Sequence, residues 1–166
     1  DYPVVMLTIN DVAQFLEEFA PLRLAADWDN VGLLVGSRQG LVERVMTCLT
    51  ITPSSAAEAM REKVGLVVAH HPLPFHPLKR ITDDTTPGRL LLSLIRHGIA
   101  VVSPHTAFDS AGRGINQQLA EKLGLAGIAP LIPEREAGPS PDRLGTGRIG
   151  EISPPISLRD LALRAS

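Results

Sequence analysis

The sequence contains a single cysteine, Cys48, among its 166 residues. One thiol cannot form a disulfide within the chain, which excludes the framework of a disulfide-stapled secreted domain. Cys48 lies in an apolar segment, and this position is typical of a small buried core residue. We therefore expect an intracellular, reducing compartment, the cytoplasm.

Long apolar runs and clusters of basic residues are also lacking. No run approaches the roughly 18 to 20 residues of a membrane-spanning helix, and no signal-peptide pattern opens the sequence. The 16 basic residues are scattered and face 18 acidic ones, which gives a formal net charge of −2. A nucleic-acid surface usually needs a clustered basic face. We expect a soluble globular protein with neither a membrane nor a nucleic acid as partner.

Both ends of the sequence read as incomplete. It begins at Asp1 without an initiator methionine, and Ser157 to Asp160 has the spacing of a helix capping box shortly before the last residue. We expect an N-terminal α/β metal-binding domain over 1–130 and a Pro- and Gly-rich loop or linker over 131–146. Residues 147–166 would begin a C-terminal part that is truncated here.

Hydrophobic spacing predicts alternating helices and strands. Short Val- and Leu-rich runs without polar alternation are typical of strands buried on both faces, and Thr-Pro pairs at 52–53 and 86–87 are typical of helix starts. We expect strands at about 32–35, 45–51, 64–69, 99–103 and 147–152, and helices at about 11–20, 53–63, 87–97 and 114–123. This order predicts an α/β fold, a mostly parallel or mixed sheet flanked by helices and built from βαβ units with right-handed crossovers.

The histidines are concentrated in one part of the chain. All five, His70, His71, His76, His97 and His105, fall between positions 70 and 105. His70 and His71 end the predicted strand 64–69, and ligands collect where such strands end. Neighbouring side chains of an extended backbone point to opposite sides, so this pair would suit two ions, or two sides of a cleft, better than one ion. Alternatively, one ring caps the strand and the other lies in solvent.

A second group of ligand-type residues follows the next predicted strand. His105 and Asp109 are four positions apart, which suits one face of a turn or helix start. Parallel strands place both segments at the same edge of the sheet, and imidazole with carboxylate is a common ligand set for zinc, manganese or iron. The two segments together predict a metal site at the C-terminal ends of the strands.

For the other polar residues, the sequence favours a structural role or does not decide between alternatives. His97 lies in the last turn of a helix, where a cation favours the helix dipole, and His76 lies in a proline-rich surface loop. Residues 112–114, Gly-Arg-Gly, precede a helix and could hold an anion, although an ordinary loop is the better interpretation. Asp27 and Asp29, on either side of a tryptophan, either cap a turn or reach the cleft, and both alternatives stay open.

Four groups of residues together resemble a known family. They are Trp28–Leu33, His70–Leu73 with Phe75, His105 and Thr106 with Asp109, and Gly147–Gly150. In order and spacing they are similar to the NGG-interacting factor-three-like family, whose members are also labelled GTP cyclohydrolase I type-two homologues. The resemblance covers about Leu7 to Ser166. It implies an α/β fold, a ring-shaped homohexamer and a two-metal site in a cleft of each subunit.

The resemblance also implies roles for individual residues. By position, His70 and His71 would each ligate one of two divalent ions (Zn, Mn or Fe), and Asp109 would be the carboxylate ligand. His105 matches a motif histidine near the metals and is the candidate catalytic residue, as a proton shuttle. The family completes its site with a histidine and a glutamate expected beyond Ser166, so the ions would be incompletely bound in this chain. Thr50 stands where the family usually has an aspartate.

The function implied by this resemblance is metal-dependent hydrolysis. Two ions can lower the pKa of a bridging water, and the family label points to the purine ring of GTP or a related nucleotide. The alternative is a non-catalytic, metal-binding hexameric scaffold or regulatory interaction protein, and a metal chaperone or store is a third interpretation.

Overall fold

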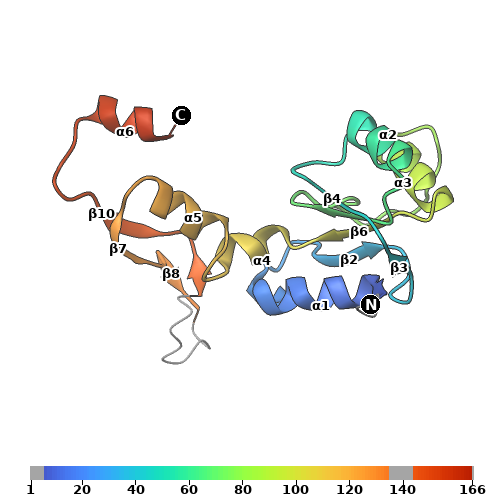
Figure 1. The fold of residues 1–166 in the computed structure, drawn as a ribbon, viewed down its shortest axis with the longest axis horizontal. Helices are drawn as coiled ribbons and strands as arrows, with labels where there is room; N and C mark the ends of the chain where they lie inside the picture. Colours follow the sequence, from blue (N-terminus) through green and yellow to red (C-terminus); the bar gives the residue numbers. More distant parts are fainter. Residues whose placement is uncertain (1–5, 135–143, 166) are drawn as a thin grey trace, which may run out of the picture. The chain divides into compact units, whose positions relative to one another are not determined.

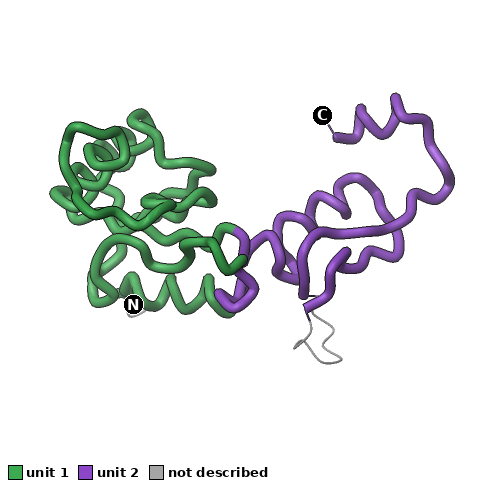
Figure 2. Tube along the Cα trace, turned by 180° about the vertical axis from the view of Figure 1, so that it is seen from behind, with its two compact units in different colours: residues 1–18, 26–105 green, residues 19–25, 106–166 purple. Residues whose placement is uncertain are grey.

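The computed structural model describes residues 6–134 and 144–165, which form two compact units. Unit 1 comprises residues 1–18 and 26–105, and unit 2 comprises residues 19–25 and 106–166 (Figure 2). The domain division at 130 and 147 stays a prediction. In the described part of the chain, no helix is both long and apolar enough to cross a membrane.

A four-stranded sheet forms the centre of unit 1 (Figure 1). The strand β5 (Leu66–Ala69) pairs in parallel with β4 (Val45–Cys48) on one side and with β6 (Ala100–Ser103) on the other. The strand β2 (Gly32–Val35) pairs antiparallel with β6, so the order is β2-β6-β5-β4. The predicted mixed α/β sheet is confirmed.

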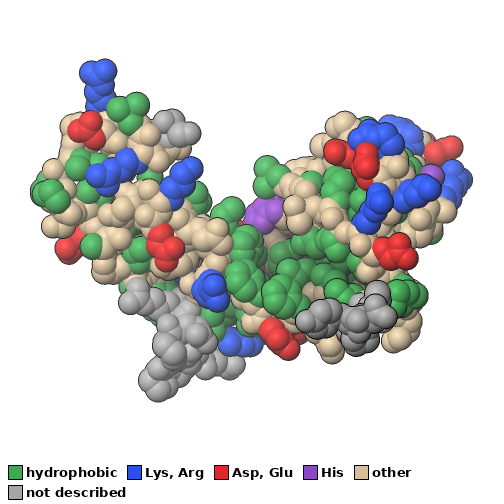
Figure 3. All heavy atoms as spheres, in the orientation of Figure 1, with side chains coloured by type: hydrophobic (Ala, Val, Ile, Leu, Met, Phe, Trp, Pro, Cys, Tyr) green, Lys and Arg blue, Asp and Glu red, His purple; other side chains and the backbone are tan. Residues whose placement is uncertain are grey.

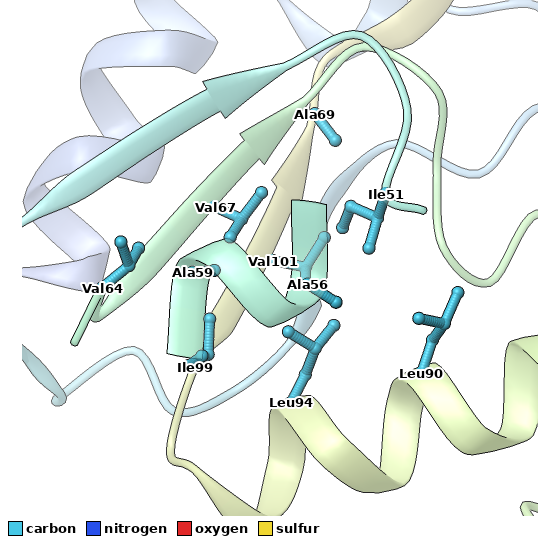
Figure 4. Close-up of a cluster of buried hydrophobic side chains, with 10 residues drawn as sticks. All are labelled: Ile51, Ala56, Ala59, Val64, Val67, Ala69, Leu90, Leu94, Ile99 and Val101. Atoms are coloured by element: carbon cyan, nitrogen blue, oxygen red, sulfur yellow. The ribbon is translucent and has the colours of Figure 1, made fainter. Parts of the chain in front are cut away.

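Helices cover both faces of this sheet. The helices α2 (Pro53–Arg61) and α3 (Thr86–Arg96) pack on one face, and α1 (Ile9–Phe19) packs on the other (Figure 1). Figure 4 shows the cluster beneath α2 and α3, which consists of Ile51, Ala56, Ala59, Val64, Val67, Ala69, Leu90, Leu94, Ile99 and Val101. Cys48 is partly buried against this cluster, and burial raises the pKa of its thiol.

The starts of α2 and α3 follow from threonine caps. The hydroxyl oxygens of Thr52 and Thr85 accept hydrogen bonds from the N–H groups of Ser55 and Gly88, each at 3.2 Å. A side-chain oxygen at this position satisfies an N–H that has no partner within the helix. The sequence predicts the α2 cap, whereas for α3 it points to Thr86. Thr85 takes that role because its hydroxyl reaches the third helical N–H.

Several short elements were not predicted. In unit 1, β1 (Leu7–Thr8) and β3 (Leu41–Val42) form an antiparallel pair. Runs of two residues are too short to show a hydrophobic period, so the sequence does not reveal them.

On the face of unit 1 seen in Figure 3, Lys and Arg side chains are interspersed with Asp and Glu.

Unit 2 is built from short helices and two antiparallel strand pairs. The helical elements are a 3₁₀ helix (Leu22–Leu24), α4 (His105–Ser110), whose first residue is the last of unit 1, α5 (Ile115–Lys122) and α6 (Leu158–Ala165). The strand pairs are β7 (Ala126–Ala129) with β10 (Ile149–Glu151), and β8 (Ile132–Pro133) with β9 (Gly145–Thr146). The guanidinium of Arg148 donates to the carbonyl oxygens of Gly145, Gly147 and Ala111, and to the side chain of Gln117.

Candidate metal centre

His70 and His71 directly follow β5, at the carboxyl end of a central strand. Their backbone N–H groups donate to the carbonyl oxygens of Cys48 and Leu49 at 3.1 and 2.8 Å, which extends the pairing with β4. The buried hydroxyl of Ser103, the last residue of β6, donates to the carbonyl oxygen of His70 at 2.7 Å. Both neighbouring strands therefore fix the backbone that carries the two imidazoles.

The two rings share one site instead of facing opposite ways. Their centroids lie 5.1 Å apart, and the ring of His105 lies 5.1 Å from His70 and 5.8 Å from His71. One donor atom from each of the three histidines lies within 4.8 Å of the other two. The expectation that His70 and His71 point to opposite sides is wrong, because the backbone bends at these residues instead of staying extended.

His105 is held by a buried carboxylate. Its Nδ1 donates to Oδ1 of Asp29 at 2.8 Å, and the carboxylate of Asp29 has no exposed surface. The same oxygen accepts the backbone N–H of Asn30 at 2.7 Å. His105 has a φ of 27°, a conformation that residues other than glycine seldom adopt. The sequence left open whether Asp29 caps a turn or reaches the cleft. The structure shows that its carboxylate reaches His105.

His71 has a different partner. Its Nδ1 shares a hydrogen bond of 2.6 Å with the hydroxyl of Thr50. When Nδ1 of an imidazole is engaged by the protein, Nε2 is the nitrogen left for a metal or a proton. Sequence reasoning noted Thr50 only as a departure from the family pattern and did not connect it with His71, because the pairing depends on how two loops meet.

The other predicted residues have separate places. Asp109 lies on α4, four positions after His105. Its backbone carbonyl oxygen accepts a hydrogen bond from the side-chain amide of Asn116 at 3.1 Å. Its role as a ligand stays a prediction. His97 caps the end of α3 with its Nδ1 2.8 Å from the carbonyl oxygen of Ser93, in agreement with the structural role predicted for it.

A pocket of about 280 Å³ opens beside the histidines. His71, Pro72, Phe75 and His105 line it. The exposed ring of Trp28 stands next to it, with its centroid 6.3 Å from that of His105. The pocket, whose lining is largely apolar, thus adjoins the rings of His71 and His105.

The donor set fits a divalent transition-metal ion. Imidazole nitrogens bind zinc at about 2.0–2.1 Å, so two nitrogens on one ion lie at most about 4.2 Å apart. The three donor atoms all lie within 4.8 Å of one another, close enough that they could hold a metal ion. Hydrogen-bonded partners on two of the rings are a usual feature of histidine ligands.

Comparison with known proteins places these features in a family context. A family model described as Duf34/NIF3 (NGG1p interacting factor 3) matches residues 7–166. The chain is 34% identical over 158 residues to a protein of Clostridium acetobutylicum named GTP cyclohydrolase 1 type 2 homolog, covering 95% of this chain and 58% of that protein. It is 35% identical over 147 residues to NIF3-like protein 1 of Drosophila melanogaster, covering 88% and 49% respectively.

Solved structures agree with the fold. A hypothetical protein of Staphylococcus aureus matches with a TM-score of 0.84 and 25% identity, over 96% of this chain and 63% of that one. Reduced HcgD from Methanocaldococcus jannaschii matches with a TM-score of 0.71 and 32% identity, over 77% and 51%. The chain thus spans about half to two thirds of the length of the relatives described here.

Proposed function

Because the chain belongs to the Duf34/NIF3 family, we propose that it is a metal-dependent hydrolase with a centre for two divalent ions. The observation that carries this proposal is the convergence of three imidazoles within 4.8 Å at the ends of β5 and β6. In the proposal, His70 and His71 each hold one ion, Asp109 supplies a carboxylate ligand, and His105 moves protons. The remaining ligands would come from outside this sequence.

The chemistry that the ions would supply is a bound water of lowered pKa and polarisation of the bond under attack. The chain's own contribution is positioning. The carboxylate of Asp29 holds the Nδ1–H of His105, which leaves Nε2 free of that bond. Nε2 would accept a proton from the attacking water and return it to the nitrogen of the carbon–nitrogen bond that is cleaved. A carboxylate that orients an imidazole in this way also stabilises its protonated form.

For the substrate, we propose the purine ring of GTP or a related nucleotide. Support comes from relatives named GTP cyclohydrolase 1 type 2 homolog and from the apolar pocket of about 280 Å³ beside the histidines. The proposal includes a homohexamer in the cytoplasm, as the family resemblance implies. Under the alternative, the assembly is a non-catalytic metal-binding scaffold or a metal store, and no nucleotide is turned over.

The test is a hydrolysis screen combined with metal analysis. The full-length protein, which would carry the remaining ligands, is loaded with Mn, Zn or Fe and incubated with GTP and other purine nucleotides. We expect turnover in the wild type and its loss in Asp109→Ala, with less bound metal. His105→Ala should lose turnover and keep its metal, because it removes a proton carrier. Turnover should persist in the control His97→Ala, whose histidine caps α3.

Each other outcome contradicts a stated part of the proposal. Loss of metal in His105→Ala would make His105 a ligand and not the proton carrier. A fully loaded protein with no turnover on any nucleotide would overturn the hydrolase and favour the scaffold. No bound metal under any condition would overturn the site itself.

A further inference from the structure

Three aromatic rings stand edge to face beside the candidate metal centre. Trp28 and Phe75 have ring centroids 6.0 Å apart at 66°, and Phe75 and His105 lie 6.2 Å apart at 89°. The pair of Trp28 and His105 lies at 6.3 Å and 76°. Edge-to-face pairs use the edge of one ring, so part of each ring face stays available to another partner.

Two exposed aromatic side chains lie together beside the pocket. Trp28 is 65% exposed and Phe75 is 37% exposed, although only 4% of the residues are aromatic. Two of these scarce side chains come from separate loops to one rim of the pocket. Single exposed apolar residues need no explanation, but a grouped aromatic rim beside convergent polar atoms is typical of a ligand site.

Hydrogen bonds fix the two loops that carry the rings. The side-chain amide of Asn30 donates to the carbonyl oxygen of Pro74 at 2.7 Å, which ties the Trp28 loop to the Phe75 loop. The buried carboxylate of Asp29 holds both the backbone N–H of Asn30 and the ring of His105. The rings are therefore preorganised, which lowers the entropic cost of binding a ligand against them.

The pocket lacks the charge that a phosphate site would need. Its lining in the described part of the chain is His71, Pro72, Phe75 and His105, without lysine or arginine. A volume of about 280 Å³ lies near the lower end of the range for small-molecule pockets. A flat heterocycle fits these features, since every nucleobase has a π face that can stack on an aromatic side chain.

We propose that Trp28 and Phe75 form a platform that binds the base of a purine nucleotide and presents it to the histidine centre. This inference rests on the proposed function and deepens it, because it assigns recognition of the substrate to the base and names the side chains responsible. Stacking positions the ring, and His71 and His105 face it from the lining of the same pocket.

The test uses the fluorescence of Trp28, which is the only tryptophan in the chain. The protein is titrated with GMP and, separately, with ribose 5-phosphate, with excitation at the red edge of tryptophan absorption, where guanine does not absorb. We expect saturable quenching by GMP and no change with ribose 5-phosphate, which has the same phosphate and sugar without the base. Phe75→Leu should weaken GMP binding roughly tenfold. Phe15→Leu, at an exposed phenylalanine of α1, should leave it unchanged.

Equal responses to GMP and ribose 5-phosphate would overturn the platform, as would equal binding by Phe75→Leu and Phe15→Leu. Metal content measured on the same samples separates this inference from the proposed function. Metal binding without a base-dependent response overturns the platform and leaves the metal centre standing. A base-dependent response in samples that bind no metal overturns the metal centre and supports the platform.

Discussion

Asp29 gives His105 a defined tautomer. An ionised carboxylate can only accept hydrogen bonds, so the ring nitrogen 2.8 Å from Asp29 carries a proton, and in the neutral ring Nε2 is then the nitrogen with a lone pair. Thr50 imposes no such choice on His71, because a hydroxyl can donate or accept. The two histidines on the pocket lining therefore differ in how firmly their partners set the tautomer.

Replacement of Asp29 by asparagine should change this tautomer. The asparagine amide can donate to Nδ1, so we expect Asp29→Asn to shift His105 toward the Nε2-protonated form. Proton-coupled ¹⁵N NMR of the imidazoles reports which nitrogen carries the proton. Asp27→Asn, at the exposed acid two positions earlier, is the matched control and should leave the His105 signals unchanged. Identical spectra for both variants would show that Asp29 does not set the tautomer.

Thr50 should limit how strongly His71 binds metal. A carboxylate partner raises the basicity of a ligating imidazole, and loss of such a partner typically costs roughly 10- to 100-fold in affinity. We expect zinc affinity to rise in Thr50→Asp and to fall in Thr50→Val, which keeps the shape and loses the hydroxyl. Competition with a chromophoric chelator measures the zinc affinities of the two variants and of the wild type. Affinities that do not follow Asp above Thr above Val would rule out this role for Thr50.

The sequence reveals the three histidines but not their partners. His70, His71 and His105 stand at strand ends, where a short buried run followed by a polar side chain is visible without a structure. Asp29 lies 76 positions from His105, and the pair meets only because two loops converge. The bend at His70 and His71 is also a local backbone feature that an alternating strand pattern does not show.

At the scale of elements, the buried strands and their helices follow from composition and caps. The strands β5 and β6 have the Val-rich pattern expected of strands covered on both faces, whereas β4, at the edge of the sheet, alternates between exposed and partly buried residues. The antiparallel direction of β2 could not be predicted, because a short strand near the start of the chain can join either edge of a sheet in either direction.

The core beneath α3 provides a stability test with a control in the same helix. Leu94 is fully buried in the cluster of Figure 4, whereas Ile95, its neighbour, is 51% exposed. Leu94→Ala should lower the free energy of unfolding by about 2–5 kcal/mol, since it removes buried methyl groups and leaves a cavity. Ile95→Ala should cost less than about 1 kcal/mol. Urea unfolding measures both. Equal losses would contradict the assignment of this helix face to the core.

Over the whole molecule, the family model matches residues 7–166. The chain nevertheless spans only about half to two thirds of the length of its relatives. The proposed two-ion centre draws three of its residues from the ends of β5 and β6. Its hexamer and its remaining ligands stay predictions from the family resemblance. The short strand pairs of unit 2 could not be predicted because two- to four-residue strands carry almost no periodic signal.

Zinc affinity decides whether the cluster of His70, His71 and His105 is a metal centre. Zinc is titrated into the wild-type chain in competition with a chromophoric chelator, with circular dichroism as the check on folding. We expect zinc binding in the wild type and in His97→Ala, and an affinity at least about tenfold weaker in His71→Ala. A folded wild-type chain that binds no zinc, or His71→Ala binding zinc as tightly as His97→Ala, would show that these histidines do not form a metal centre.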